Sequence, residues 1–198
     1  ALKNKDEFRI KSARLLGRLK DKRALGPLIY ALPYREGHDW VADALNKIDP
    51  NWMSSETFKK AAPVFINALK EEQCFKYALE SLYKIDAQWM CSQAAKDAVP
   101  SFVTLLKEGK SNVRCNMAKT LGLIKDPSAL EPLIAEMKHK DCYDEVKKAI
   151  ETTDPNWMDS QAARNALPMF IEMLNDADRN VRLEAAKALE GIKDKRAI

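Results

Sequence analysis

Glycine is scarce in this chain: only six occur among 198 residues, and runs of β-branched residues are absent. Both absences argue against β-sheets, because strands are rich in β-branched residues and the turns between them use glycine. No apolar stretch approaches the ~20 residues that a helix needs to cross a bilayer. We therefore expect an all-helical chain with no membrane partner.

The residues that usually carry chemistry are also few. Only two histidines occur, His38 and His139, and their spacing is not that of metal ligands. The four cysteines contain no CxxC pair; they are Cys74, Cys91, Cys115 and Cys142. A glycine-rich phosphate loop and a GxSxG motif are missing, and the carboxylates are scattered at helical spacing. The sequence therefore predicts no metal, no cofactor, no catalytic residue and no enzymatic activity.

The charge balance is close to even. Lysine and arginine number 33 against 29 acidic residues, which gives a net charge of +4. This excess permits an acidic partner but does not require nucleic acid. Unpaired cysteines in a helical chain are typical of a reducing compartment, and no secretory leader opens the sequence, so we expect a cytoplasmic location.

The chain does contain internal repetition. The block Asp-Pro-Asn-Trp-Met at 49–53 recurs letter for letter at 154–158, and a relaxed copy, Asp-Ala-Gln-Trp-Met, lies at 86–90. A second block, Leu-Lys-Asp-Lys-Arg-Ala at 19–24, returns at 192–197 with isoleucine in first place. Self-similarity at a period of a few tens of residues predicts a stack of repeated structural units.

Six amphipathic segments recur, and their aligned positions are 29, 37, 39, 29 and 39 residues apart. Apolar residues fall at i, i+4, i+7, i+8 and i+11, which is the stripe of a helix with one buried face. In the first segment the predicted stripe is Phe8, Ser12, Leu15, Leu16 and Leu19. We name these segments the B helices; their aligned positions are Leu16, Leu45, Leu82, Leu121, Ile150 and Leu189.

The segments between the B helices, here named the A helices, each contain a proline: Pro27, Pro63, Pro100, Pro132 and Pro168. In three of them a serine stands about eight residues before the proline and can cap a helix start; these are Ser55, Ser92 and Ser160. Proline lacks an amide donor, so we expect a kink in these three helices. In the two shorter segments the proline falls near the first turn, where it is tolerated.

A kinked A helix, a turn and a straight B helix in succession resemble the HEAT repeat, and most closely the short HEAT-like units first described in phycobilin lyases. The resemblance is carried by Ala-Leu-Glu-Pro-Leu-Ile at 129–134 and by Asn-Val-Arg-Leu-Glu-Ala-Ala-Lys-Ala-Leu at 180–189. It extends over essentially the whole chain. It implies an all-α fold, a right-handed α-solenoid (superhelix) of about five HEAT-like helix pairs, in a single domain over residues 1–198. Because the sequence begins inside a B helix and ends where an A helix would start, we expect this domain to be truncated at both ends.

The resemblance says less about function, because the family includes scaffolds, lyases, a hydroxylase and DNA-repair enzymes. The hydroxylases use repeated His-Glu pairs, and no such pair occurs here. A DNA-repair activity would need a catalytic residue, and none can be matched. A lyase- or chaperone-like role toward a chromophore protein is suggested by the resemblance alone.

Several recurring residues are interpreted as structural. Trp52, Trp89 and Trp157 occupy one column and are expected to fill gaps between repeats, each after an aspartate that can cap a turn. Cys74 and Cys142 occupy the first buried column of their B helices, where cysteine packs as a small apolar residue. The two histidines are expected in solvent-exposed loops.

The remaining candidates lie on the B-helix face that is exposed in HEAT-type solenoids, the concave surface. Trp40 and Tyr77 share a column on adjacent helices, and Arg18, Lys47 and Lys84 form a basic row beside them. Exposed aromatic residues next to basic ones suit a protein or peptide partner. A second hypothesis is that Arg14, Arg18, Lys47 and Lys84 bind nucleic acid, although acidic residues interrupt the row. The plain alternative is that Trp40 packs against a loop and the lysines only keep the helices soluble.

Overall fold

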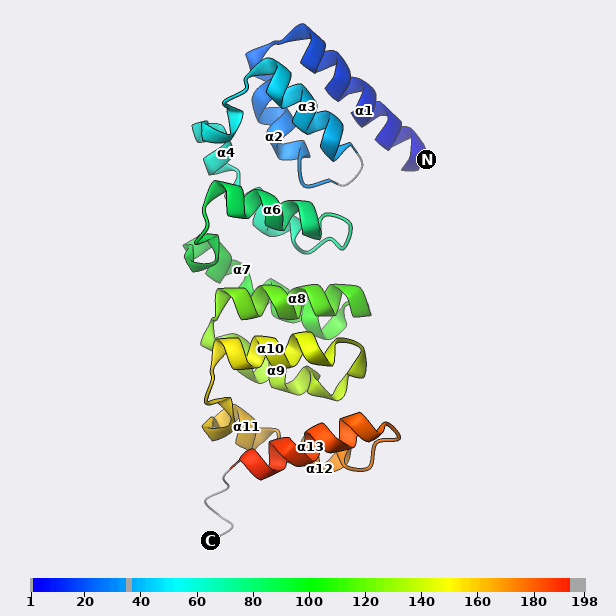
Figure 1. Cartoon of the computed structure of the whole chain (residues 1–198), viewed down its shortest axis with the longest axis vertical. Coiled ribbons are helices and arrows are strands. Elements are labelled where there is room, and N and C mark those ends of the chain that lie inside the picture. The colour runs from blue at the N-terminus through cyan, green and yellow to red at the C-terminus, as the bar shows by residue number, and fades with distance from the viewer. Residues whose placement is uncertain (1, 35–36, 193–198) are drawn as a thin grey trace. The chain divides into compact units, whose positions relative to one another are not determined.

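The computed structural model describes residues 2–34 and 37–192, and every regular element within those ranges is a helix (Figure 1). The predicted all-α fold is thus confirmed. Backbone contacts divide the chain into two compact units, residues 1–98 and 99–198. Residues 193–197, which carry most of the second Lys-Asp-Lys-Arg-Ala block, lie outside the described residues, as does the A helix expected to start there.

Unit 1 contains three B helices: α1 (Leu2–Leu19), α3 (His38–Ile48) and α6 (Phe75–Ile85). The A helices before α3 and α6 are α2 (Leu25–Ala31), α4 (Glu56–Lys60) and α5 (Ala62–Ala68). Short 3₁₀ turns precede the A helices: η1 (Lys22–Ala24), η2 (Trp52–Ser54) and η3 (Trp89–Cys91). Helix α2 packs on α3 and α5 packs on α6, while α1 lies along α3.

The boundary between the units falls within α7 (Gln93–Glu108). The B helices of unit 2 are α8 (Ser111–Ile124), α10 (Tyr143–Thr153) and α13 (Arg179–Gly191). Its other A helices are α9 (Leu130–Ala135), α11 (Gln161–Asn165) and α12 (Leu167–Met173). Its 3₁₀ turns are η4 (Pro127–Ala129), η5 (Glu136–Lys138), η6 (Lys140–Cys142) and η7 (Trp157–Asp159). Up to residue 192, five A–B pairs therefore follow α1, which is the helix order of an α-solenoid.

Proline shapes the A helices in two ways. Helix α4 ends at Lys60 and α5 begins at Ala62, so Pro63 falls in the first turn of a new helix, and Pro168 does the same in α12. Helix α7 instead runs through Pro100. The predicted serine caps are present: the hydroxyls of Ser55, Ser92 and Ser160 accept hydrogen bonds from Phe58, Ala95 and Ala163 at 3.2, 3.2 and 3.1 Å.

Two kinds of turn follow the B helices, according to the spacing between their aligned positions. We call the spacings of 37 and 39 residues long steps and the spacings of 29 residues short steps. In the three long steps the aspartate side chain accepts from the amide two residues on; these are Asp49, Asp86 and Asp154, at 2.9, 2.8 and 2.9 Å. In the two short steps a lysine in the left-handed region ends the helix, Lys20 at φ 55° and Lys125 at φ 57°. A single residue in this conformation closes a helix C-terminus tightly.

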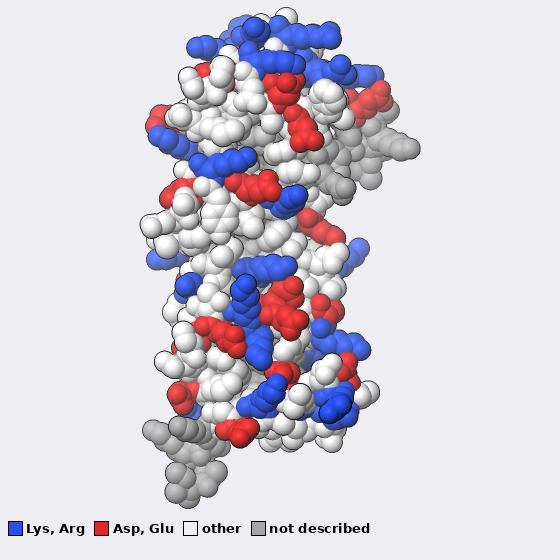
Figure 2. All heavy atoms as spheres, in the orientation of Figure 1, with Lys and Arg blue, Asp and Glu red and all other residues white. Residues whose placement is uncertain are grey.

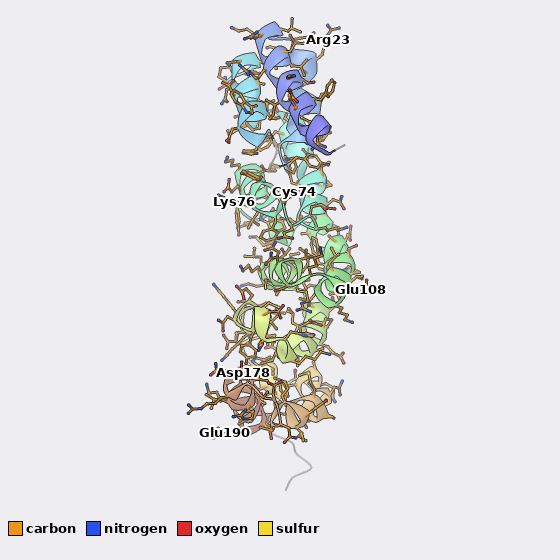
Figure 3. The ribbon with its side chains drawn as sticks, turned by 90° about the vertical axis from the view of Figure 1, so that its right-hand side faces the viewer. Arg23, Cys74, Lys76, Glu108, Asp178 and Glu190 are labelled. Atoms are coloured by element: carbon orange, nitrogen blue, oxygen red, sulfur yellow. The ribbon has the colours of Figure 1, made fainter. Side chains whose placement is uncertain are left out.

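The recurring tryptophans and cysteines are buried, as predicted. Trp52, Trp89 and Trp157 are 3%, 1% and 4% exposed. The Nε1 of Trp52 donates to Asn46 Oδ1 at 2.9 Å, and its ring meets Phe58 edge-on with centroids 4.9 Å apart. Cys74, labelled in Figure 3, and Cys142 are buried at the starts of α6 and α10.

Glycine allows two pairs of B helices to approach closely, and sequence reasoning missed this. A Cβ added at Gly17 of α1 would lie 2.9 Å from the Cα of Ala44 on α3. A Cβ at Gly122 of α8 would lie 2.8 Å from the Cα of Ala149 on α10. Both contacts fall at the 29-residue steps and at matching helix positions, so the two short steps bring B-helix backbones together in the same way.

The predicted core stripe of the first B helix is wrong in large part. Phe8, Leu15 and Leu19 of α1 are 72%, 58% and 64% exposed. Ala13 and Gly17, on the opposite side, are buried instead, because α3 lies against that side. Among the described residues no A helix covers the apolar side of α1.

Candidate interaction surface

The six residues predicted to bind a partner all lie on the B helices of unit 1. They are Arg14 and Arg18 on α1, Trp40 and Lys47 on α3, and Tyr77 and Lys84 on α6. Five of them are exposed and Tyr77 is half-buried. We call these six residues the B-helix surface of unit 1.

Trp40 is held against α1 by a cation–π contact. The guanidinium carbon of Arg14 lies 4.9 Å from the centroid of the Trp40 ring, and the tryptophan remains 43% exposed. The helix starts after Gly37, whose φ of 94° only glycine adopts readily, and this places Trp40 in the first turn. Such a contact contributes about 0.5–1 kcal/mol at an exposed site, so it orients the ring without hiding it.

Tyr77 and His38 form the contact between α3 and α6. Their ring centroids are 4.3 Å apart at an interplanar angle of 32°. The Nδ1 of His38 lies 2.8 Å from the carbonyl oxygen of Leu32, and because a carbonyl only accepts, Nδ1 carries the proton. The prediction that His38 is a solvent-exposed loop residue is therefore wrong: the residue opens α3 and its ring is fixed on both sides. His139 is half-buried as well, with Nε2 3.7 Å from Glu136 Oε2.

The basic row has a local explanation as well as a functional one. Arg18, Lys47 and Lys84 each lie in the last turn of their B helix. Positive side chains there interact favourably with the negative end of the helix dipole. Lys47 is also paired with Asp43 at 2.6 Å, so the row offers less free positive charge than its sequence suggests.

A second arginine–aromatic contact was not foreseen. The guanidinium carbon of Arg9 on α1 lies 4.5 Å from the centroid of the Tyr34 ring, and Tyr34 is 38% exposed. Tyr34 follows α2, outside any repeated column, so only the packing of α1 shows that the two residues meet. Arg9 and Arg14 thus both place a guanidinium group over an aromatic ring of unit 1.

Unit 2 has a corresponding junction, between α10 and α13. Tyr143 and Glu184 occupy the columns of His38 and Tyr77, and the Tyr143 hydroxyl donates to Glu184 Oε2 at 3.0 Å. Lys147 and Lys187 also donate to this carboxylate, at 2.9 and 2.6 Å. A pocket of about 270 Å³ opens beside it; its lining is Lys140, Tyr143, Asp144, Asp178, Asn180, Val181 and Glu184. At the long step within each unit the B helices thus meet through side chains, whereas at the short step they also meet through a close glycine–alanine approach.

The electrostatics of this junction favour a fixed ion network over proton transfer. Burial alone would raise the pKa of Glu184, but the hydrogen bonds from Lys187, Lys147 and Tyr143 outweigh it and lower the pKa to about 2. Burial, together with the neighbouring Glu184 charge, raises the pKa of Tyr143. Hydrogen bonding to Glu184 raises the pKa of Lys147. Each group is thus held in its ordinary charge state, as in a structural contact.

A second polar cluster in unit 2 surrounds Arg114 of α8. Its Nη2 pairs with Asp141 Oδ2 at 2.5 Å, across the start of η6. Glu136 is 5% exposed, and burial raises the pKa of its carboxyl group. Burial, with the neighbouring thiol of Cys115, raises the pKa of Cys142 to about 12. A thiol with so high a pKa is a poor nucleophile.

Neither a metal site nor a membrane span occurs among the described residues. No three histidine, cysteine or acidic side chains within 2–34 and 37–192 are placed to share a metal ion. Over the same part of the chain, every helix is too short or too polar to span a bilayer.

Two stretches of the sequence match known protein-family models. A family model of HEAT repeats matches residues 63–153, and a second model, of the single HEAT repeat, matches residues 166–194. No curated protein matches the chain. The matched stretches contain four of the five A–B pairs, in part or in full, with their prolines at positions 63, 100, 132 and 168. Residues 63–153 and 166–194 therefore match the HEAT-repeat family.

Proposed function

We propose that this chain is a non-enzymatic interaction scaffold that holds a protein or peptide partner on the B-helix surface of unit 1. HEAT repeats are commonly scaffolds of this kind, which supports the general assignment. The concave position of this surface and the cytoplasmic location belong to the same proposal. The lyase- or chaperone-like role rests on the resemblance to phycobilin lyases alone, and the scaffold is preferred.

The exposed Trp40 carries the proposal. An aromatic ring that is fixed by Arg14 on one side and open on the other loses little conformational entropy when a partner covers it. Tryptophan and arginine are also the residues most enriched among those that dominate binding energy. Tyr77 contributes less contact area because His38 already covers part of its ring.

The test is a capture experiment from nuclease-treated lysate of the source cells with three forms of the protein: wild type, Trp40→Ala and Met53→Ala. Met53 is also 43% exposed but lies on η2, away from the B-helix surface, which makes it a matched control. A partner held by wild type and by Met53→Ala but lost from Trp40→Ala is the expected result. Equal capture by all three forms would contradict the proposal.

Stability must be measured alongside, because a lost partner could reflect a lost fold. Trp40→Ala removes one exposed cation–π contact of about 0.5–1 kcal/mol, so its melting temperature should fall by only about 1–4 °C. By contrast, Trp52→Ala removes a buried ring and should cost about 3–5 kcal/mol. If Trp40→Ala were as unstable as Trp52→Ala, Trp40 would be a core residue and not a binding one.

Nucleic acid is a second candidate partner because positive charge is concentrated at one end of the sequence. Residues 2–23 hold nine of the 33 basic residues and three of the 29 acidic ones. Binding through Arg14, Arg18, Lys47 and Lys84 would weaken steeply as salt is raised, since each neutralised phosphate releases a counterion. A flat salt response in a duplex-binding assay would exclude it, and the Asp43–Lys47 pair already counts against it.

A further inference from the structure

Two of the four cysteines meet in unit 2, and the function proposed above does not use them. Cys115 lies in α8, and Cys142 ends η6 directly before α10. The Cys115 thiol donates to the carbonyl oxygen of Asp141 at 3.6 Å, which places its sulfur beside the peptide group that joins Asp141 to Cys142. The two thiols also lie within hydrogen-bonding reach of each other. Cys115 and Cys142, here named the thiol pair, thus connect neighbouring repeats at a short step.

The backbone around the thiol pair is already held in place by other contacts. Helix α8 packs on both η6 and α10. Arg114, next to Cys115, pairs with Asp141, next to Cys142, at 2.5 Å. Further along the same two helices, Gly122 lies close against Ala149. Because both segments are fixed before any bond forms, joining the two sulfurs costs little further conformational entropy.

The two thiols differ in exposure in a way that suits stepwise oxidation. Cys115 is half-buried, so a small reagent can reach it, whereas Cys142 is buried. Burial, together with the neighbouring Cys115 thiol, raises the pKa of Cys142 to about 12, so Cys142 keeps its proton while Cys115 reacts. Redox-sensing cysteines commonly have this arrangement, in which an accessible sulfur is oxidised first and an adjacent thiol resolves it.

The surface of unit 2 suits a small, neutral oxidant. Basic and acidic side chains are interspersed over α8, α10 and α13 (Figure 2), and several are paired, as Lys119 is with Glu145 at 3.4 Å and Lys147 with Glu184 at 2.9 Å. Such a surface has no field of one sign to draw in a charged oxidant such as glutathione disulfide. Hydrogen peroxide is uncharged and needs no such field to reach Cys115.

We propose that Cys115 and Cys142 form a reversible disulfide when the protein meets hydrogen peroxide, and that this bond is a redox-sensitive link between two repeats of unit 2. In a reducing compartment, disulfides are usually transient and redox-sensing. The bond would tie η6 to α8, and Lys140 of η6 and Tyr143 directly after it line the pocket beside Glu184. The proposal does not rest on the function proposed above, because it concerns unit 2 and needs no partner.

The oxidation proceeds in two balanced steps. The Cys115 sulfur attacks one peroxide oxygen, the O–O bond breaks, and the thiol proton leaves with the released hydroxide as water, which gives a sulfenic acid. The Cys142 sulfur then attacks the Cys115 sulfur; the S–S bond forms, the S–O bond breaks, and the second thiol proton leaves with hydroxide as water. Two electrons thus pass from the two sulfurs to one peroxide. A dithiol reductant reverses the bond by thiol–disulfide exchange.

The experiment treats the full chain with hydrogen peroxide, blocks the remaining thiols with N-ethylmaleimide and digests the protein with trypsin without reductant. Trypsin releases Cys115 in the peptide Cys-Asn-Met-Ala-Lys (115–119) and Cys142 in Asp-Cys-Tyr-Asp-Glu-Val-Lys (141–147), so one linked mass identifies the bond. The variants are Cys115→Ser and Cys142→Ala. Cys91→Ser is the control, because Cys91 is exposed and outside the thiol pair.

Wild type and Cys91→Ser should form the bond of the thiol pair at least about tenfold faster than wild type forms any bond to Cys91, because the paired thiols are already in contact. Dithiothreitol should remove it. Cys142→Ala should stop at the sulfenic acid of Cys115, which dimedone traps. The oxidised wild type should melt about 5 °C or more above the reduced form, since the bond closes a loop of one repeat and restricts the unfolded chain.

Three results would overturn the proposal. These are oxidation of Cys115 to sulfinic acid while Cys142 stays free, linkage of Cys115 to Cys74 or Cys91 as readily as to Cys142, and a lower melting temperature of the oxidised form, which would show that the bond distorts the fold.

A further measurement on wild type guards against a Cys142→Ala variant that does not fold. In concentrated urea the preference of Cys115 for Cys142 should weaken, because only the folded chain holds the two thiols in contact. A preference that urea leaves unchanged would contradict the proposal, since proximity along the sequence and not the fold would then be its cause.

Discussion

Glu184 and Glu136 show how their surroundings decide the behaviour of one residue type. Glu184 accepts hydrogen bonds from a tyrosine and two lysines at 2.6–3.0 Å, and it is ionised at all ordinary pH values. Glu136 is almost fully buried, and its Oε2 has no hydrogen-bond partner within the described part of the chain. Burial therefore raises the pKa of Glu136, while the donors around Glu184 lower its pKa.

The pH dependence of stability should report the Glu184 network. Its carboxyl pKa falls from the ordinary 4.5 to about 2 on folding, so its contribution to stability is complete above pH 4.5 and is lost as the pH falls toward 2. We expect wild type to lose free energy of unfolding more steeply than Glu184→Gln between about pH 5 and 3. Urea denaturation followed by circular dichroism at each pH measures both slopes. Parallel slopes would show that the network contributes nothing in solution.

Among single residues, sequence periodicity predicted the buried ones better than the contacting ones. The three tryptophans and the two cysteines were placed correctly because each recurs at a fixed column of a repeat. The pairs Arg14–Trp40, Arg9–Tyr34 and His38–Tyr77 join different helices, and no column reveals which side chains will meet. Whether the B-helix surface binds a partner stays a prediction.

At the scale of helices, the two step lengths correspond to two ways of joining B helices. Short steps place Gly17 against Ala44 and Gly122 against Ala149. Long steps insert the tryptophan stretch, and the long step within each unit brings B helices together through side chains, His38 with Tyr77 and Tyr143 with Glu184. The signal for the close contacts was present in the sequence, as a glycine inside each of two B helices at matching positions. It could have been found by asking why an interior helix position lacks a side chain.

Substitution of these glycines should separate close packing from helix propensity. Gly17→Ala and Gly122→Ala would each gain up to about 1 kcal/mol in helix propensity, yet the added Cβ would lie within 3 Å of a neighbouring backbone. We expect a net loss of about 1–3 kcal/mol in the free energy of unfolding. Gly26→Ala in α2 is the control, because its Cβ would meet only a Thr57 methyl at 3.8 Å. This control should be neutral or stabilising; if all three variants behaved alike, packing would not be the cause.

The error in the first B helix has a physical origin. The pattern of Phe8, Leu15 and Leu19 correctly indicated a helix with an apolar face. A periodic pattern states that a face is apolar, but a neighbour must be present to bury it. The described residues supply a neighbour only on the Ala13 and Gly17 side, so the larger side chains of α1 remain exposed.

For the molecule as a whole, the cysteines provide one internal probe for each unit. Cys74 is buried in unit 1 and Cys142 in unit 2, while Cys91 is exposed. Native-state alkylation with iodoacetamide should modify Cys91 first. The rates at Cys74 and Cys142 should be lower by at least about a hundredfold, because their units must open before the reagent reaches them. Peptide mass spectrometry gives the rate at each site. Modification of Cys74 or Cys142 as fast as Cys91 would contradict the burial described for that unit.

The stretch that distinguishes a long step from a short one contains a turn, a buried tryptophan and a helix-capping serine. The aspartate side chain fixes the turn by accepting from the amide two residues on, the tryptophan lies in the core, and the serine caps the next helix. We expect that deletion of such a stretch together with the first part of the A helix that follows it would keep the B helices and change how neighbouring B helices meet. Gain or loss of about ten residues would therefore change the spacing between B helices without a new fold.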